Sequence, residues 1–121
     1  MPKVLIIDDS RFSRMKLSDN IKSGGFDIIE AGNGEEGINA VRKEKPDAVI
    51  CDLLMPVMDG FGFLEILREE KHNIPVLILT SDIQDKTRQK TMELGAKGLL
   101  NKPPKYEEVI AKLNDLLGEA K

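Results

Sequence analysis

The sequence predicts a single α/β domain built on an open, doubly wound, parallel β-sheet. Short apolar runs alternate with amphipathic, helix-like stretches from one end of the 121 residues to the other. No linker, low-complexity segment or internal repeat interrupts this alternation. Three of the apolar runs are nearly continuous, as expected for parallel strands that are covered by helices on both faces.

Five strands account for the apolar runs. The expected strands span residues 3–8, 26–31, 48–52, 76–80 and 98–101. The second run contains Asp27 and Glu30, and charged residues of this kind are typical of an edge strand. We therefore place residues 26–31 at one edge of the sheet.

Capping residues and glycines mark the helices between these strands. We expect helices to open at Ser10, Asn33, Asp59 and Asp85, and to close at Gly24 with Gly25 and at Gly95. Glu36, three residues after Asn33, completes a capping-box pattern for the second helix.

The fourth and fifth helices differ in apolar content. The fifth has an apolar stripe at helical spacing, formed by Tyr106, Val109, Ile110, Leu113, Leu116 and Leu117. Residues 85–94, by contrast, are nearly all polar. A helix with so little apolar surface is expected to be loosely docked and to respond to small changes nearby.

Strict alternation of five strands and five helices predicts right-handed crossovers and the flavodoxin-like strand order 2-1-3-4-5. Strand 1 then lies between strands 2 and 3. Ligands of such sheets bind beyond the carboxyl ends of the strands, where the strand order reverses between strands 1 and 3. Residues that follow these two strands are therefore the first candidates for a site.

Composition excludes several functions. A net charge of −3 with both signs interspersed leaves no basic stripe, so no direct nucleic-acid binding is expected. Four phenylalanines, one tyrosine and no tryptophan argue against a base-stacking platform. The apolar runs are too short for membrane insertion or for a secretory signal. We expect a cytoplasmic monomer, a single domain over residues 1–121 with no output domain, and a buried thiol at Cys51.

Reactive side chains collect at the carboxyl ends of four expected strands. They are Asp8 and Asp9, Asp52, Thr80 with Ser81, and Asn101 with Lys102. Each has an ordinary alternative, since one early acid could cap a helix, a threonine is common at a strand end, and a lysine is usually solvated. Asp52 fits such explanations poorly, because an apolar loop follows it instead of a helix. The occurrence of all these side chains at the carboxyl ends of strands in one sheet predicts a functional site there.

Three neighbouring carboxylates repel one another unless a cation neutralises them or some become protonated. With oxygen ligands and no nearby histidine or thiolate, Mg²⁺ is the expected ion. A carboxylate beside Mg²⁺ and a lysine is also a plausible nucleophile toward phosphorus. The cation, Lys102 and the Thr80 hydroxyl could then stabilise a transferring phosphoryl group.

Four segments carry a family resemblance. They are "VLIIDDS" (4–10), "VICDLLMPVMDG" (49–60), "VLILTSD" (76–82) and "GLLNKPP" (98–104). Together, in this order and at these spacings, they resemble the receiver domain of two-component response regulators, of the single-domain, chemotaxis-regulator kind. The resemblance spans the chain from the first strand through the last helix.

The resemblance implies a role for each site residue. Asp52 would accept a phosphoryl group from a phosphohistidine on a histidine kinase or phosphotransfer protein. Asp9 and Asp52 would ligate Mg²⁺ directly, together with the backbone carbonyl of Leu54, and Asp8 would act through water. Thr80 and Lys102 would bind the phosphoryl oxygens. The resemblance also suggests a cis peptide bond between Lys102 and Pro103.

It further implies a regulator, not an enzyme, with self-catalysed phosphotransfer and slow autodephosphorylation. Phosphorylation would alter partner binding on a face of roughly residues 83–110, which comprises the fourth helix, fifth strand and fifth helix. The downstream partner would be another, unidentified protein.

Two positions depart from the family pattern. Leu99 replaces an aromatic residue that is common three positions before the lysine, which puts an aromatic switch in doubt. The positions that tune hydrolysis in the family are Leu54 and Asp82 here. Leu54 offers no group to position water, whereas Asp82 could do so, and the phosphoryl lifetime is left open.

Three other functions are compatible with parts of this pattern. A Mg²⁺-dependent phosphatase with an aspartyl nucleophile would need a second aspartate where Leu54 stands. A flavin-binding module would need a phosphate-binding loop where Asp8 and Asp9 stand. A receiver fold that serves only as a docking module is the third, although every acid of the site is present.

Overall fold

Strands and helices alternate along the chain, which the computed structural model describes over residues 1–119. The strands are β1 (Lys3–Ile7), β2 (Asp27–Ala31), β3 (Ala48–Asp52), β4 (Val76–Thr80) and β5 (Gly98–Asn101). The helices are α1 (Arg11–Ser23), α2 (Gly34–Glu44), α3 (Gly60–Glu69), α4 (Asp85–Glu93) and α5 (Tyr106–Glu119). None of these helices is long and apolar enough to cross a membrane.

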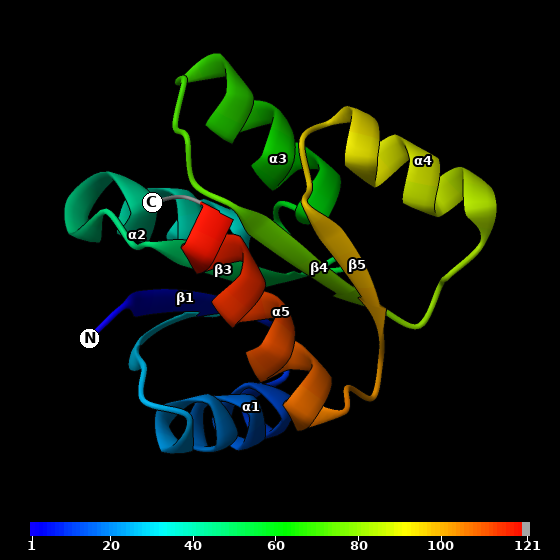
Figure 1. The fold of residues 1–121 in the computed structure, drawn as a ribbon. Helices are drawn as coiled ribbons and strands as arrows, with labels where there is room; N and C mark the ends of the chain where they lie inside the picture. The colour runs from blue at the N-terminus through cyan, green and yellow to red at the C-terminus, as the bar shows by residue number, and fades with distance from the viewer. Residues whose placement is uncertain (120–121) are drawn as a thin grey trace.

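The strands form one parallel sheet in the order β2-β1-β3-β4-β5, which confirms the predicted fold class and topology. The charged strand β2 lies at the edge, as expected. In Figure 1, α1 and α5 lie on one side of the sheet, and α2, α3 and α4 lie on the other.

Two apolar clusters hold the helices on the sheet. On one face, alternate strand residues such as Val4, Ile50 and Leu77 pack with Leu17 of α1 and Leu113 of α5. On the other face, the intervening strand residues pack with the buried side chains of α2 and α3, which include Ile38, Val41, Phe63, Leu64 and Leu67. The alternation of side chains along parallel strands therefore fills both layers, which explains why these strands are apolar throughout.

Three helices begin with the predicted caps. The Ser10 and Asn33 side chains accept hydrogen bonds from backbone N–H groups three residues later. Asp59 does the same for α3, with 2.9 Å between its Oδ1 atom and the Gly62 nitrogen. Glu36 reaches back to the Gly32 N–H, so the box-like pattern at α2 is also present. These caps satisfy backbone donors that the first helical turn leaves free.

Helix α4 begins differently. Asp85 is its first residue, but the cap position belongs to Gln84, whose side chain makes no capping hydrogen bond. The two buried residues of the helix are Thr87 and Thr91, and the larger apolar Met92 is 45% exposed. Threonines thus replace the apolar anchors that hold the other helices.

Two strand boundaries were predicted one residue too far out. The expected strand 3–8 ends at Ile7, because the Asp8 side chain accepts a hydrogen bond from the Ser10 N–H and the backbone turns there. The expected strand 26–31 begins at Asp27, and Phe26 is instead buried against the cluster on the α1 side.

Candidate metal centre

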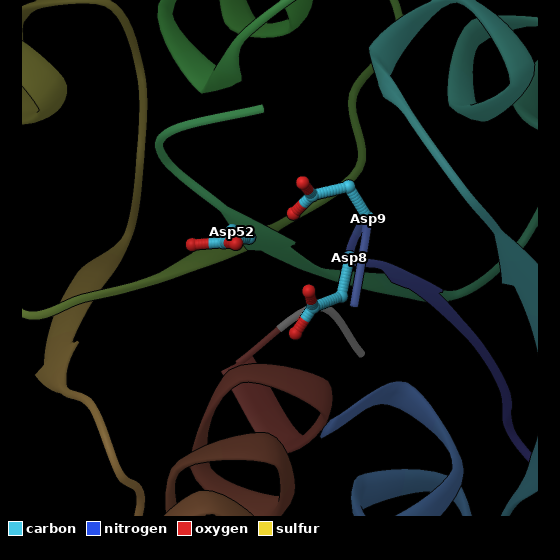
Figure 2. A group of neighbouring side chains, drawn as sticks. All are labelled: Asp8, Asp9 and Asp52. Atoms are coloured by element: carbon cyan, nitrogen blue, oxygen red, sulfur yellow. The ribbon is translucent and has the colours of Figure 1, made fainter. Parts of the chain in front are cut away.

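Three aspartates meet beyond the ends of β1 and β3. Asp8, Asp9 and Asp52 each offer a carboxylate oxygen, and these oxygens all lie within 4.8 Å of one another. Figure 2 shows the three side chains gathered beside the strand ends. The structure therefore brings together the three acids that the sequence placed at the ends of two strands.

Sheet register explains this meeting. Ile7 of β1 is paired with Cys51 of β3, so the next residue of each chain segment, Asp8 and Asp52, stands at the same level of the sheet. Asp8 is almost fully buried, Asp52 is partly buried and Asp9 is exposed. The site is thus open to solvent on the Asp9 side.

Lys102 joins two of the acids. Its Nζ atom lies 3.1 Å from Asp8 Oδ2 and 3.2 Å from Asp52 Oδ2. The backbone places it there, because the Lys102 N–H donates to the Thr80 carbonyl and continues the pairing of β4 with β5. Lys102 is therefore paired with two acids of the cluster and is not an isolated solvated lysine.

The charges of the cluster act on one another. Burial raises the pKa of Asp52, Lys102 opposes that rise, and the neighbouring Asp8 and Asp9 add to it. Burial alone would lower the pKa of Lys102, but hydrogen bonding and charge attraction to Asp8 and Asp52 raise it overall. One ammonium thus compensates only part of the negative charge, and a second cation would be favourable here.

Asp8 is held in place from several directions. Its Oδ1 atom accepts a hydrogen bond of 2.8 Å from the Ser10 N–H, and its carbonyl accepts one of 2.6 Å from Arg14 Nη1. Arg14 also pairs with Glu30 of β2 at 2.9 Å. Arg14 was not predicted from the sequence, and no motif points to it, because its reach depends on how α1 crosses the ends of β1 and β2.

Thr80 is buried at the end of β4. Asp52 is paired with Leu79, so Thr80 lies one residue further along the neighbouring strand. Its Oγ1 atom accepts a hydrogen bond of 3.1 Å from the Asp82 N–H. Thr80 therefore lies at the carboxyl ends of the strands, on the same side of the sheet as Asp52. The binding of a phosphoryl oxygen by its hydroxyl stays a prediction.

The loop after Asp52 has one buried and one exposed leucine. Leu53 is buried, and its carbonyl accepts a hydrogen bond of 2.7 Å from the Gly60 N–H. The Leu54 side chain is 64% exposed, and the metal-binding role of its carbonyl stays a prediction. Val57 has a φ of 72°, an unusual backbone conformation for a β-branched residue.

Other predicted residues lie as follows. Cys51 is fully buried, and burial raises the pKa of its thiol well above the usual value. The peptide bond between Lys102 and Pro103 is cis, as the resemblance suggested. Leu99 is buried in the cluster on the α3 side. His72 lies outside the site and is hydrogen bonded to Glu70.

The chemistry of the acid cluster fits a magnesium ion. All three side chains present oxygen ligands, two of them are constrained by burial and hydrogen bonds, and the third faces solvent. Mg²⁺ is commonly held by one or two carboxylates and completes its coordination with water or phosphate oxygens. An oxygen-only cluster that opens to solvent on one side suits this mode of binding.

Several known proteins are similar to this chain in sequence. A family model described as response regulator receiver domain matches residues 4–114. Protein PilH of Pseudomonas aeruginosa is 33% identical over 119 residues, which cover 97% of this chain and 98% of PilH. The alkaline phosphatase synthesis transcriptional regulatory protein PhoP of Bacillus subtilis is 33% identical over 115 residues. The chain spans about half the length of PhoP and of the other first curated relatives, whose matches cover 48–54% of their length.

Solved structures agree with the fold. The receiver domain of Francisella response regulator 1452 is similar over 100% of both chains, with a TM-score of 0.96 and 29% identity. The chemotaxis protein CheY4 of Vibrio cholerae has a TM-score of 0.90 and 32% identity, over 96% of this chain and 98% of that one. Both likenesses extend over the strands and helices that position the acid cluster.

Proposed function

The chain belongs to the response regulator receiver domain family, and from this membership we propose that Asp52 accepts a phosphoryl group from a phosphohistidine on a histidine kinase or phosphotransfer protein. Receiver domains are signalling regulators of two-component systems and not classical enzymes. The observation that carries the proposal is the position of the Asp52 carboxylate, which lies between two further acids and the Lys102 ammonium.

In the proposed transfer, a carboxylate oxygen of Asp52 attacks phosphorus. An oxygen–phosphorus bond forms, the phosphorus–nitrogen bond of the phosphohistidine breaks, and its electron pair returns to the imidazole. The Lys102 ammonium would move from the Asp52 carboxylate to an oxygen of the phosphoryl group. It is near enough to do so, because its ion pairs with Asp8 and Asp52 hold its Nζ atom beside the acceptor. Thr80 would donate its hydroxyl hydrogen to another of these oxygens.

Asp9 and Asp52, with the carbonyl of Leu54, would hold Mg²⁺, and Asp8 would act through water. When bound, the ion supplies positive charge that offsets the charge on the transferring phosphoryl group. Asp8 keeps its hydrogen bonds to Ser10 and Lys102 in this arrangement and so orients the cluster. Asp9, which is exposed, lies on the side from which a phosphorylated partner would approach.

We propose a slow loss of the phosphoryl group by hydrolysis. Leu54 stands where an aspartyl phosphatase would carry its acid and base, and its side chain is apolar and 64% exposed. A long-lived acyl phosphate suits a signal better than a turnover catalyst. The phosphatase alternative is therefore not favoured.

The proposed output is a change in affinity for a partner protein on the face formed by α4, β5 and α5. We propose that the protein acts as a single receiver domain and as a cytoplasmic monomer. Two findings support this location. Thr80, which would contact the phosphoryl group, begins the segment that leads to α4, and α4 is held by threonines instead of large apolar side chains. Charge added at Asp52 can shift such a weakly anchored helix.

Intact-mass measurement tests the proposal. Wild-type protein incubated with Mg²⁺ and acetyl phosphate should gain the mass of one phosphoryl group, and Asp52→Asn should not. Asp59→Asn is the matched control, because asparagine caps a helix as well as aspartate and position 59 caps α3. A gain of equal size in Asp52→Asn, or no gain in wild type with the phosphodonor or a phosphorylated histidine kinase, would contradict the proposal.

A further inference from the structure

A chain of hydrogen bonds leads from Thr80, at the end of β4, to the first turn of α4. The Asp82 N–H donates to Thr80 Oγ1 at 3.1 Å. The two carboxylate oxygens of Asp82 then bind α4, because Oδ1 accepts from the Gln84 N–H at 3.2 Å and Oδ2 accepts from Thr87 Oγ1 at 2.8 Å. Thr80 and Thr87 are buried, and Asp82 is partly buried between them.

Asp82 supplies side-chain hydrogen bonds at the start of α4, where the cap residue supplies none. The residue at the cap position, Gln84, makes no side-chain hydrogen bond to the first turn. Asp82 instead holds the Gln84 N–H just before the helix and a hydroxyl in its first turn. Because α4 has only Thr87 and Thr91 as buried residues, these polar contacts add to an attachment that has few buried apolar side chains.

The route through an aromatic side chain is missing in this protein. Leu99 on β5 is buried in the cluster on the α3 side and has no polar atom with which to reach Thr80. The polar contacts that run from Thr80 to α4 are instead those of the Asp82 backbone N–H and carboxylate.

We propose that Asp82 is a positioning residue that couples the Thr80 hydroxyl to α4 through Thr87. This inference deepens the proposed function and rests on it for its biological meaning. When Thr80 turns toward a phosphoryl oxygen, its Oγ1 atom leaves the Asp82 N–H. The Asp82 segment then shifts, its carboxylate releases Gln84 and Thr87, and the start of α4 loosens.

The two proposals fail separately, because the coupling has a readout that needs no phosphorylation. Thr80→Val and Thr87→Val each remove one hydroxyl and keep the shape of the side chain. Each should raise amide hydrogen exchange in residues 83–95 by roughly 2- to 30-fold, the range that corresponds to loss of a capping contact. The double variant should raise amide exchange in residues 83–95 only slightly more than the stronger single variant does, because both changes break the same chain of contacts.

Two further variants separate coupling from simple damage to the helix. Thr87→Ser keeps the hydroxyl and should restore wild-type exchange. Thr91→Val is the matched control, because Thr91 is also buried in α4 but its hydroxyl donates to the Arg88 carbonyl within the same helix. It should leave the effect of Thr80→Val unchanged, so that the two substitutions act additively.

Acetyl phosphate and Mg²⁺ then test the link to signalling, with mass gain measured in every sample. Wild type should show faster exchange in residues 83–95 after phosphorylation, whereas Thr87→Val should gain phosphate and show little further change. Additive effects of Thr80→Val and Thr87→Val, or an undiminished response in phosphorylated Thr87→Val, would overturn the coupling while the phosphoacceptor assignment stands. Coupled exchange effects without any mass gain would instead uphold the coupling and contradict the assignment.

Discussion

Lys102 and Asp8 lie 94 positions apart in the sequence, and a hydrogen bond of 3.1 Å joins them. The bond connects the segment after β5 to the end of β1, across β3 and β4. Since the same ammonium also binds Asp52, one side chain holds the two buried acids of the cluster together.

Removal of this ammonium should destabilise the fold. Lys102→Ala leaves two partly buried carboxylates without their cation, and we expect a loss on the order of 1–3 kcal/mol in the free energy of unfolding. Urea unfolding at neutral pH without Mg²⁺ measures it. Lys105→Ala, at an exposed position three residues later, is the control and should change stability little. Equal stability of Lys102→Ala and wild type would show that the bridge formed by Lys102 between Asp8 and Asp52 contributes nothing to the free energy of unfolding.

The bridge also predicts a pH dependence. The folded-state pKa of Lys102 is raised above 10.5, so its contribution is complete below that value and is lost as the pH rises through the folded-state pKa. The stability difference between wild type and Lys102→Ala should therefore shrink above about pH 10.5. Thermal unfolding of both proteins between neutral and alkaline pH measures this difference. A gap that widened with rising pH would contradict the assigned pairing.

Magnesium should stabilise the folded protein. An ion that binds only the folded state adds about 2.7 kcal/mol at a concentration one hundred times its dissociation constant. Asp9→Asn should lose most of this gain while folding normally, because Asp9 is exposed. Tm values with and without MgCl₂ measure the effect, and removal of the ion by EDTA should reverse it. Asp47→Asn, far from the site at the start of β3, should respond to the ion like wild type.

Val57 should be replaceable by glycine with a gain in stability. Its φ of 72° costs a β-branched residue roughly 1–2 kcal/mol, and its side chain is 75% exposed, so little packing is lost. Glycine forfeits about 0.5–1 kcal/mol in the unfolded chain, which leaves a net gain of up to about 1.5 kcal/mol. Val57→Ala keeps the Cβ atom and should gain nothing. Equal unfolding midpoints for the glycine and alanine variants would argue against strain.

An ion-pair cluster at the other end of the molecule should respond to acid. Hydrogen bonds from Arg42 and then His72 lower the pKa of Glu70 from 4.5 to about 2. Its contribution to stability is therefore present above pH 4.5 and is lost as the pH falls toward 2. Glu70→Gln should be less stable than wild type at neutral pH, and this difference should disappear below about pH 2.

The effect should be small, because the three side chains are accessible to water. Thermal unfolding across the acid range measures it, with Glu69→Gln as the control at the preceding position. A constant difference between Glu70→Gln and wild type from neutral pH to pH 2 would exclude the ion pairs as its cause.

The sequence was sufficient for the sheet and for the acids. The strands at 48–52, 76–80 and 98–101 were predicted to the residue, because each is apolar up to the polar residue at which it ends, Asp52, Thr80 or Asn101. The grouping of Asp8, Asp9 and Asp52 could then be predicted from the strand order alone, because the carboxyl ends of the adjacent parallel strands β1 and β3 lie side by side.

Contacts that depend on the path of a loop or the crossing of a helix could not be predicted. Arg14 reaches the Asp8 carbonyl only because of how α1 lies over the sheet. The sequence showed only that the Asp82 carboxylate could position water, and the structure adds that this carboxylate accepts hydrogen bonds from Gln84 and Thr87. The path of the loop between β4 and α4 decides this, and the spacing of these residues does not fix that path.

The buried thiol of Cys51 has a practical consequence for optical measurements. It is the only cysteine of the chain, it has no exposed surface, and burial disfavours its reactive thiolate form. A cysteine introduced at Met92, on the exposed surface of α4, would therefore be the one site that a maleimide dye modifies in the native protein. A fluorophore could thus be attached to the helix without replacing any native residue of the interior.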